Sequence, residues 1–410
     1  MRLLSDEPWR RNQQVMVATV FVVFTGFAFV LPFLPLYVRQ LGVRDEGAVA
    51  LWAGVLISVA PLIAGLMAPL WGRLADRFGQ KHMAIRALVA YVVLLTLSAL
   101  VTSVTQLLAL RIGIGLFGGL GPLGLAMATS LAPRDQTGRA VGMIQAAQIL
   151  SAAVGPLVGG LLADLVGIRM TFLATASLCA AALALVIRHY QDPPQKEGRE
   201  STADGQGFGE IMRVPRVAPL LVVLFLVNFV GRSFTPILPL HLQGLGVPPG
   251  RLALSTGVLI SVYSVAAAVS AATLGKASRT YSPRALLALS LLGGALTVAP
   301  MARVTSLSAL LALALLLGLV SGGALTLCYT IGGLLVPLER RTTAFGFFAG
   351  AALFGGAVSP PVAGLIAPWD LRGIYYIDAF LFAALVVSLL PALLRRGPSE
   401  VAEARVGTDS

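Results

Sequence analysis

Apolar stretches of about 20 residues or more recur along the whole chain, separated by short polar segments. A helix needs about 20 predominantly apolar residues to cross the hydrocarbon core of a bilayer. Of the 410 residues, 57% are hydrophobic and 12% are charged, which is more apolar surface than a soluble core can enclose. The sequence therefore predicts an all-α protein that crosses the membrane several times.

Twelve stretches of this kind can be distinguished, six in each half of the chain. Pro and Gly within them do not argue against spanning helices, because neighbouring helices in a bundle can satisfy the freed backbone groups. The predicted spans are Val15–Val38, Ala50–Trp71, Met83–Thr102, Gln106–Leu131, Gly138–Leu162, Met170–Ile187, Ala218–Leu242, Ala253–Leu274, Arg284–Ala302, Ser306–Val336, Thr343–Ile366 and Gly373–Leu394. They predict a six-helix bundle over residues 1–187, a cytoplasmic linker over 188–217, a second six-helix bundle over 218–394 and a cytoplasmic tail over 395–410.

Basic residues are distributed unevenly between the two sets of loops. With the N-terminus in the cytoplasm, 22 of the 30 Lys and Arg residues fall on cytoplasmic segments, 6 on outer segments and 2 within spans. Such an excess on the cytoplasmic side is the general rule for membrane proteins. We therefore expect both termini to face the cytoplasm. The net charge of +12 is then explained by basic residues on the cytoplasmic side of a membrane protein, and no nucleic acid partner is predicted.

The sequence does not indicate metal, cofactor or enzyme chemistry. Cys179 and Cys328 fall within spans, where they are expected to be small apolar packing residues, and the three His residues are scattered. No GxxxxGK[ST] loop occurs, which argues against an ATP-driven pump. The sequence contains no evident combination of nucleophile, base and orienting group that would suggest an enzyme.

The two halves of the chain repeat one another. PFLPLYVRQLGV at Pro32–Val43 resembles PILPLHLQGLGV at Pro236–Val247, and the hexapeptide GVLISV occurs at both Gly54–Val59 and Gly257–Val262. An even number of spans separates each pair, so the two halves have the same orientation and are related by a pseudo-two-fold axis along the membrane normal. Two such bundles can rock against each other around a midplane site, which favours a carrier.

The sequence GRLADRFGQK, at Gly72–Lys81, lies between the second and third spans. Gly72 and Gly79 permit tight turns, Arg77 and Lys81 are basic anchors on the cytoplasmic side, and Asp76 offers a carboxylate to a neighbouring helix end. This segment resembles the signature loop of the major facilitator superfamily. The resemblance implies that Asp76 latches the cytoplasmic face closed; the alternative is a basic loop that only sets topology. The equivalent segment of the second half has Arg279 in place of Asp76.

Two further segments resemble motifs of this superfamily. LLALRIGIGLFGG in the fourth span contains Arg111, which is either a functional group of the bundle interior or a structural Arg that binds backbone carbonyls. The fifth span contains GMIQAAQILSAAVGPLVGG, which resembles the motif of the family's drug:proton antiporters, although Ser151 stands where that motif has Gly. The resemblance implies a bendable seam between the halves, whereas ordinary small-residue packing is the alternative. Its other members are Gly142, Gly155, Pro156, Gly159 and Gly160.

Charged groups within the spans are few. Arg232 in the seventh span is expected to line the cavity between the halves, near Asn228, unless it pairs with Asp378 or with backbone. No Asp or Glu lies centrally in any span, so the proton-coupling residue cannot be identified. Asp378 is the candidate, and an anchor at the outer interface is its alternative role. Arg111 and Arg232 without a central acid predict an electropositive cavity that prefers neutral or anionic substrates.

The whole pattern resembles bacterial twelve-span multidrug exporters of the drug:proton antiporter group. The resemblance implies a monomeric, proton-coupled exporter of small amphipathic molecules in the cytoplasmic membrane. A dedicated exporter of one metabolite, such as a sugar, siderophore or lipid-like compound, is the closest alternative. A non-transporting membrane sensor is the other, and it would be expected to lack the latch and the hinge glycines.

Overall fold

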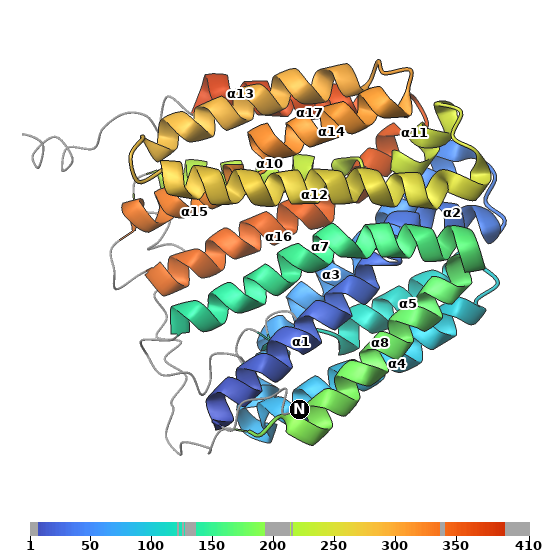
Figure 1. Ribbon diagram of the computed structural model, residues 1–410, viewed down its shortest axis with the longest axis vertical. Coiled ribbons are helices and arrows are strands. Elements are labelled where there is room, and N and C mark those ends of the chain that lie inside the picture. The colour runs from blue at the N-terminus through green and yellow to red at the C-terminus, as the bar shows by residue number, and fades with distance from the viewer. Residues whose placement is uncertain are drawn as a thin grey trace, which may run out of the picture.

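The computed structural model describes residues 7–120, 123–124, 127, 137–192, 214, 216–336 and 341–389. Throughout these residues the secondary structure is helical, with no β-strand (Figure 1). The all-α class predicted from the sequence is confirmed. Most of the predicted linker, and the whole tail at 395–410, lie outside the described residues, and the domain boundaries stay a prediction.

The first half contains eight described helical segments. They are α1 (Pro8–Ala28), the 3-10 turn η1 (Leu31–Phe33), α2 (Leu34–Gln40), α3 (Glu46–Phe78), α4 (Gln80–Leu100), α5 (Val104–Phe117), α7 (Thr137–Val166) and α8 (Ile168–His189). The second half contains ten. They are α10 (Val217–Ser233), α11 (Leu238–Gly244), η3 (Pro249–Arg251), α12 (Leu252–Ala277), α13 (Pro283–Met301), α14 (Leu307–Ser321), α15 (Ala324–Leu335), α16 (Arg341–Ile366), α17 (Gly373–Ala384) and η5 (Leu385–Leu389).

Nine helices in the described part of the chain are long and apolar enough to cross a membrane, and a tenth span results if α10 and α11 are counted together. Two shorter apolar helices, Val104–Phe117 and Gly373–Val387, overlap the fourth and twelfth predicted spans. The remainder of each of these spans includes residues that the structure does not describe. The multi-pass architecture is confirmed, whereas the number twelve stays a prediction.

Helices are interrupted at equivalent positions in the two halves. The first span breaks between α1 and α2, where Pro32 and Pro35 occur, and the seventh breaks between α10 and α11, where Pro236 and Pro239 occur. Proline has no N–H to donate and clashes with the preceding turn, so each pair ends one helix and starts the next. The two parts of the seventh span meet at an angle of 44°.

Glycine pairs produce a second set of interruptions. Helix α5 ends before Gly118 and Gly119, and Gly119 has a φ of +102° that favours glycine. The equivalent pair, Gly322 and Gly323, separates α14 from α15. The sequence predicted a continuous fourth span over Gln106–Leu131, and the described part is instead broken at this pair.

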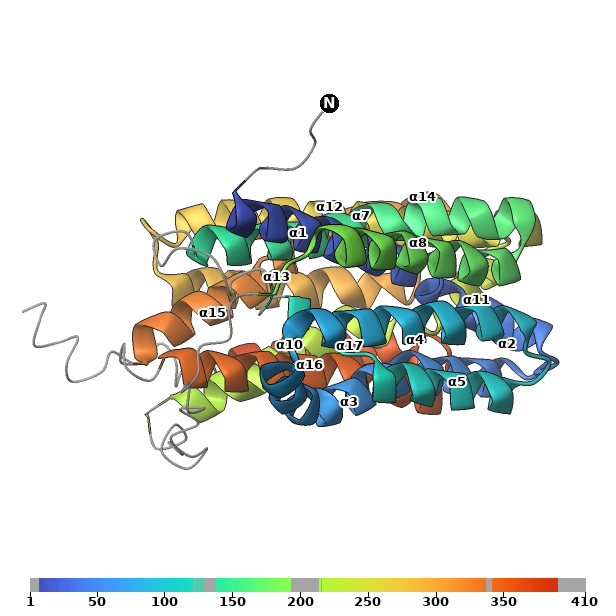
Figure 2. The ribbon, with the colours of Figure 1, turned by 90° about the horizontal axis from the view of Figure 1, so that it is seen from below.

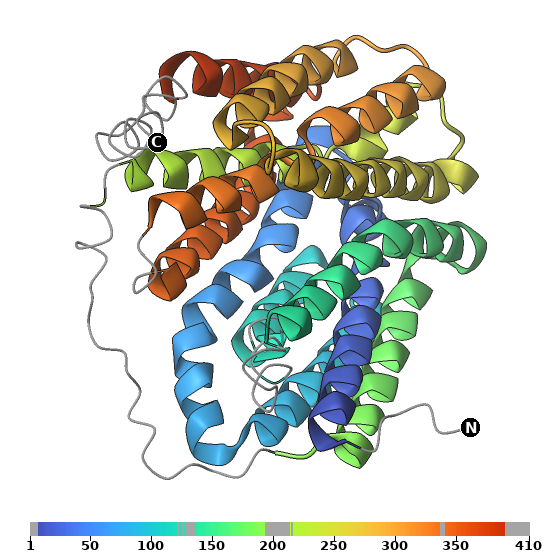
Figure 3. The same cartoon turned by 60° about the vertical axis from the view of Figure 1, so that its left-hand side comes forward.

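The repeated hexapeptide makes the same contact twice between the halves. A Cβ atom at Gly54 of α3 would overlap the carbonyl group of Pro360 in α16, and one at Gly257 of α12 would overlap that of Pro156 in α7. The helix pairs α3–α16 and α7–α12 therefore cross at backbone contact, which only glycine permits at these points. Figure 3 shows the blue-to-green and yellow-to-red groups of helices meeting along these pairs.

Among the described residues, the halves share a buried core at one end of the molecule and not at the other. One buried apolar cluster extends from the first half into the region of Phe234, Leu252 and Tyr375, and a separate cluster contains Val217, Ala344 and other residues from the opposite end of the second half. In Figures 1 and 2, α2 and α11 lie together at the shared end. The charge distribution predicts that this end faces outwards.

Candidate functional site

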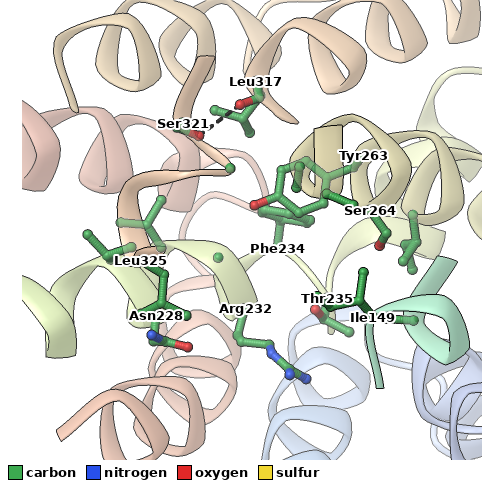
Figure 4. Close-up of a pocket in the computed structure, with 18 of the residues that line it drawn as sticks. Ile149, Asn228, Arg232, Phe234, Thr235, Tyr263, Ser264, Leu317, Ser321 and Leu325 are labelled. Atoms are coloured by element: carbon green, nitrogen blue, oxygen red, sulfur yellow. Dashed lines mark hydrogen bonds between the residues drawn. The ribbon is translucent and has the colours of Figure 1, made fainter. Parts of the chain in front are cut away.

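A cavity of about 460 Å³ lies where the two halves meet, and Figure 4 shows the side chains around it. Residues from α1, η1 and α7 form one side, and residues from α10, α12, α14, α15 and α17 form the other. Most of the lining is apolar. The interrupted helices of both halves contribute Pro32 and the segment around Arg232, so the cavity lies beside the two repeat-related breaks.

The polar groups of the cavity come mainly from two helices. Asn228 and Arg232 lie on one side of α10, and Tyr263 and Ser264 reach in from α12 (Figure 4). The Arg232 side chain is exposed to the cavity, and no acidic partner or hydrogen-bond acceptor is paired with it in the described part of the chain. Both residues that the sequence singled out for the cavity, Asn228 and Arg232, lie in this lining.

Arg111 lies elsewhere. Its side chain is 1% exposed, it does not line the cavity, and its Nε donates to the carbonyl oxygen of Leu56 at 2.9 Å. Arg111 therefore joins α5 to α3 within the first half. This is the structural role that the sequence left as the alternative, and any positive potential in the cavity comes from Arg232.

The segment Gly72–Lys81 was expected to be a loop, but Gly72 to Phe78 form the last two turns of α3. The turn to α4 consists of Gly79 alone, with a φ of +90°. The Lys81 backbone N–H donates to Asp192 at 2.8 Å, and its Nζ donates to the Ile187 carbonyl at 2.9 Å, so the segment binds to the end of α8 in its own half. Arg77 is exposed, Gly72 has open space beside it, and the side chain of Asp76 lies outside the described residues.

The glycine-rich segment of α7 contacts both halves. Cβ atoms at Gly155 and Gly159 would overlap α1 of the same half, whereas one at Gly160 would lie 2.5 Å from the Ala253 carbonyl oxygen of α12. The Ser151 hydroxyl lies 2.7 Å from the Ala147 carbonyl oxygen of its own helix and 2.9 Å from the Phe21 carbonyl oxygen of α1, and its one hydrogen can be donated to either. A Cβ atom at Gly142 would meet no atom of the described residues within 4 Å. Only the outer part of this segment, around Pro156 and Gly160, lies on the seam between the halves.

Two acidic residues have roles that the sequence did not reveal. Asp164 at the end of α7 accepts from the Ala253 N–H at 3.2 Å and the Leu254 N–H at 2.8 Å. These N–H groups are free at the start of α12, so a carboxylate of one half caps a helix of the other. Asp378 is fully buried in α17 and contacts Ser233, so it is not an exposed anchor and does not pair with Arg232. No group of three or more His, Cys, Asp or Glu that could hold a metal ion occurs among the described residues.

Comparison with known proteins identifies relatives over the whole length of the chain. A model of the family described as Major Facilitator Superfamily matches residues 16–257 and 250–409. Multidrug resistance protein MdtG of Citrobacter koseri is 34% identical over 302 residues, covering 72% of this chain and 74% of that protein. The protein of the same name from Salmonella heidelberg is 33% identical over 389 residues, covering 92% of this chain and 94% of its own.

Solved structures with the same fold have low sequence identity. A bacterial homolog of the human lysosomal transporter Spinster, in an inward-facing and unoccupied conformation, has a TM-score of 0.77 at 16% identity, covering 96% of this chain and all of that one. The nucleoside transporter NupG has a TM-score of 0.75 at 14% identity, covering 94% and 100%. At this identity the likeness concerns the fold alone.

Proposed function

The chain belongs to the major facilitator superfamily, a family of membrane transporters, and from this premise we propose that it exports small amphipathic molecules by proton-coupled alternating access. Relatives named multidrug resistance proteins support export of drugs or similar metabolites. One observation carries the proposal, namely the cavity at the junction of the halves, beside breaks that occur at equivalent positions in both repeats. Interrupted helices in corresponding positions of two repeats are the usual location of a transporter's binding site.

The cavity lining favours neutral or anionic amphipaths as substrates. Most of the wall is apolar, which suits the hydrophobic part of an amphipath and suits a sugar poorly. Arg232 presents an unpaired positive charge to the same space. An anion brought there gains a charge-assisted hydrogen bond, while a lipophilic cation is repelled. A dedicated exporter of a single lipid-like anion would use the same features.

The arrangement of the halves supports alternating access. Asp164, Gly160 and Gly257 hold the halves together at the predicted outer end, whereas at the other end the described residues of the two halves form separate apolar clusters. We infer that this is an inward-facing arrangement, in which the latch segment Gly72–Lys81 is bound to its own half. A non-transporting sensor would need neither the contacts between the halves nor those of the latch segment. We further propose a monomer in the inner membrane with both termini in the cytoplasm, on the basis of the basic residues on that side.

The proposal is tested by flux in proteoliposomes with an imposed pH gradient. The probes are fluorescein as an anion and ethidium as a cation, with protein-free vesicles as the control. We expect fluorescein transport that depends on the pH gradient and little movement of ethidium. Gradient-independent leakage of both dyes, or efficient transport of ethidium alone, would contradict the proposed substrate class.

Substitution of Arg232 gives a sharper prediction. Arg232→Ala is expected to raise the KM for fluorescein about 10- to 100-fold, since a hydrogen bond to a charged group contributes about 1.5 to 3 kcal/mol. Arg232→Lys keeps the charge and is expected to lose less. Arg303→Ala, which alters an exposed outer arginine bound to Tyr376, is the matched control and should leave KM unchanged. Equal KM values for wild type and Arg232→Ala would exclude Arg232 from the binding site.

A further inference from the structure

Asp378 is a buried carboxyl group with too few partners for its charge. Its side chain is fully buried, and its Oδ1 atom has no hydrogen-bond partner among the described residues. The Oδ2 atom contacts the hydroxyl of Ser233, and no Lys or Arg forms an ion pair with Asp378 in the described ranges. An ionised carboxylate deprived of water and of a cation is unstable, and such a group holds a proton instead. The packing around Asp378 therefore suits the neutral acid.

The hydroxyl of Ser233 supports the same assignment. Its Oγ atom lies 3.0 Å from the carbonyl oxygen of Val230 and also contacts Asp378 Oδ2. A hydroxyl has one hydrogen, so it can donate to only one of these two oxygens. If Asp378 is protonated, it donates to Ser233 and Ser233 donates to Val230. If Asp378 is ionised, Ser233 must turn its hydrogen to the carboxylate and release the Val230 carbonyl.

Few other titratable groups approach this site. Tyr375 lies one helical turn before Asp378 on α17, and its hydroxyl is 3.0 Å from His241 Nδ1 on α11. The Nε2 atom of His241 is buried, and no described residue forms a hydrogen bond with it. Two cations lie near the start of α17 on that side: Arg372, which precedes its first residue, and Arg303, whose Nε donates to the Tyr376 hydroxyl at 3.0 Å. Arg232 on α10 points into the cavity instead. The described parts of α13 and α16 bring only apolar and hydroxyl side chains to α17, because their charged residues, Arg284 and Arg341, occur at the opposite ends of these helices.

The position of Ser233 connects this site to the cavity. Ser233 is the last residue of α10, immediately after Arg232 and before the break that leads to α11. Phe382, one turn after Asp378 on α17, lines the cavity, so the carboxyl group lies one layer behind the wall. A change in the Ser233 hydrogen bond thus acts on the same helix end that presents Arg232 to substrate.

We propose that Asp378 is the proton-binding site of this transporter and that Ser233 couples its protonation to the position of Arg232. The carboxylate takes a proton from water on the predicted outer side, past Tyr375 and His241, and returns it to water when the halves change position. Loss of the proton frees the Val230 carbonyl and loosens the end of α10. This proposal rests on the proposed function and identifies the residue that carries its coupling.

The test compares net transport with exchange in proteoliposomes, using fluorescein as the probe. In Asp378→Asn we expect pH-gradient-driven accumulation and fluorescein-dependent proton movement to be lost. Counterflow of labelled against unlabelled fluorescein, which needs no net proton transfer, should remain. Asp370→Asn is the matched control, because Asp370 is an exposed acid close to the start of the same helix. Full proton-coupled accumulation by Asp378→Asn would overturn the proposal and leave the proposed function intact.

Wild-type protein provides a second test that does not depend on the folding of this variant. Its infrared spectrum should contain the carbonyl band of a protonated carboxylic acid at neutral pH, which Asp370→Asn retains. Absence of this band at neutral pH would overturn the proposal. Ser233→Ala should shift the pH profile of transport and Ser233→Thr should restore it. Accumulation that follows a sodium gradient instead would also contradict the assignment, whereas absence of fluorescein transport by wild type in any mode would contradict the proposed function.

Discussion

Arg111 and Arg232 are both single arginines within apolar helices, yet their surroundings differ. Arg111 is enclosed between α5 and α3 and bonded to the Leu56 carbonyl, whereas Arg232 extends into the cavity. A buried arginine that touches no substrate contributes through packing and hydrogen bonding. Removal of each side chain should therefore produce a different kind of defect.

Arg111→Ala is expected to lower the free energy of unfolding by about 2 to 5 kcal/mol, the range for truncation of a large buried side chain. The KM of the folded fraction should stay at the wild-type value, because Arg111 lies outside the cavity lining. Arg232→Ala is the matched control, with the opposite pattern of near-normal stability and raised KM. Thermal unfolding in detergent together with flux measures both. A stable Arg111→Ala protein with a raised KM would place Arg111 in the binding site.

The sequence identifies Arg111 and Arg232 as candidates, but it does not show in which direction each side chain points. In a helix that is apolar on every side, no contrast in polarity separates the lipid-facing side from the protein-facing side, since lipid and core are equally apolar. The sequence therefore suggests that both Arg111 and Arg232 contribute charge to the cavity, whereas in the structure Arg232 lines the cavity and Arg111 does not. The sequence places Asp378 towards the predicted outer end of its span, but its burial against Ser233 depends on how α17 and α10 pack, which no local pattern encodes.

At the scale of helices, the sequence shows the repeat but not the contacts that the repeated residues make. GVLISV was found in both halves, and the structure adds that its glycine contacts a proline carbonyl of the opposite half in each case. Helix lengths were underestimated where a helix continues beyond the apolar stretch, as in α3, which runs to Phe78. The apolar stretch ends at the membrane surface, but the helix continues because each further residue adds a hydrogen bond.

Gly54→Val and Gly257→Val are expected to separate the halves at the predicted outer end, because the added atoms overlap backbone that cannot move aside. Overpacking costs about 1 to 3 kcal/mol, which corresponds to a shift of roughly 5- to 150-fold in the equilibrium between open and closed seams. The measurement is labelling of a cysteine at the buried Ala50 by an external, membrane-impermeant maleimide. Both variants should increase labelling.

Gly65→Val is the matched control for this experiment. Gly65 lies on the same helix as Gly54 but has no neighbour within 4 Å, so the same chemical change meets open space. The cysteine at position 50 should be labelled at the same rate in the Gly65→Val protein as in the protein that keeps Gly54, Gly65 and Gly257. Equal labelling of the Gly54→Val and Gly65→Val proteins would contradict a closed seam at this position.

At the scale of the molecule, the contacts described here belong to one of two states. Duplication predicted two similar bundles around a shared site, but it could not predict which end is closed, since one sequence must specify both states with similar energies. Asp164 and the glycine contacts stabilise closure at the predicted outer end, and we propose that the latch segment Gly72–Lys81 stabilises the opposite state. Export requires the molecule to alternate between them.

The most direct test of alternation uses Arg39 and Gln243, which are repeat-related, exposed and in contact across the predicted outer end. Both are replaced by Cys in a protein whose buried Cys179 and Cys328 are changed to Ala, and the pair is joined by a short reducible bifunctional reagent. We predict that the cross-linked protein loses net transport, still binds fluorescein from the cytoplasmic side, and regains transport on reduction. Undiminished transport with the cross-link in place would contradict the account.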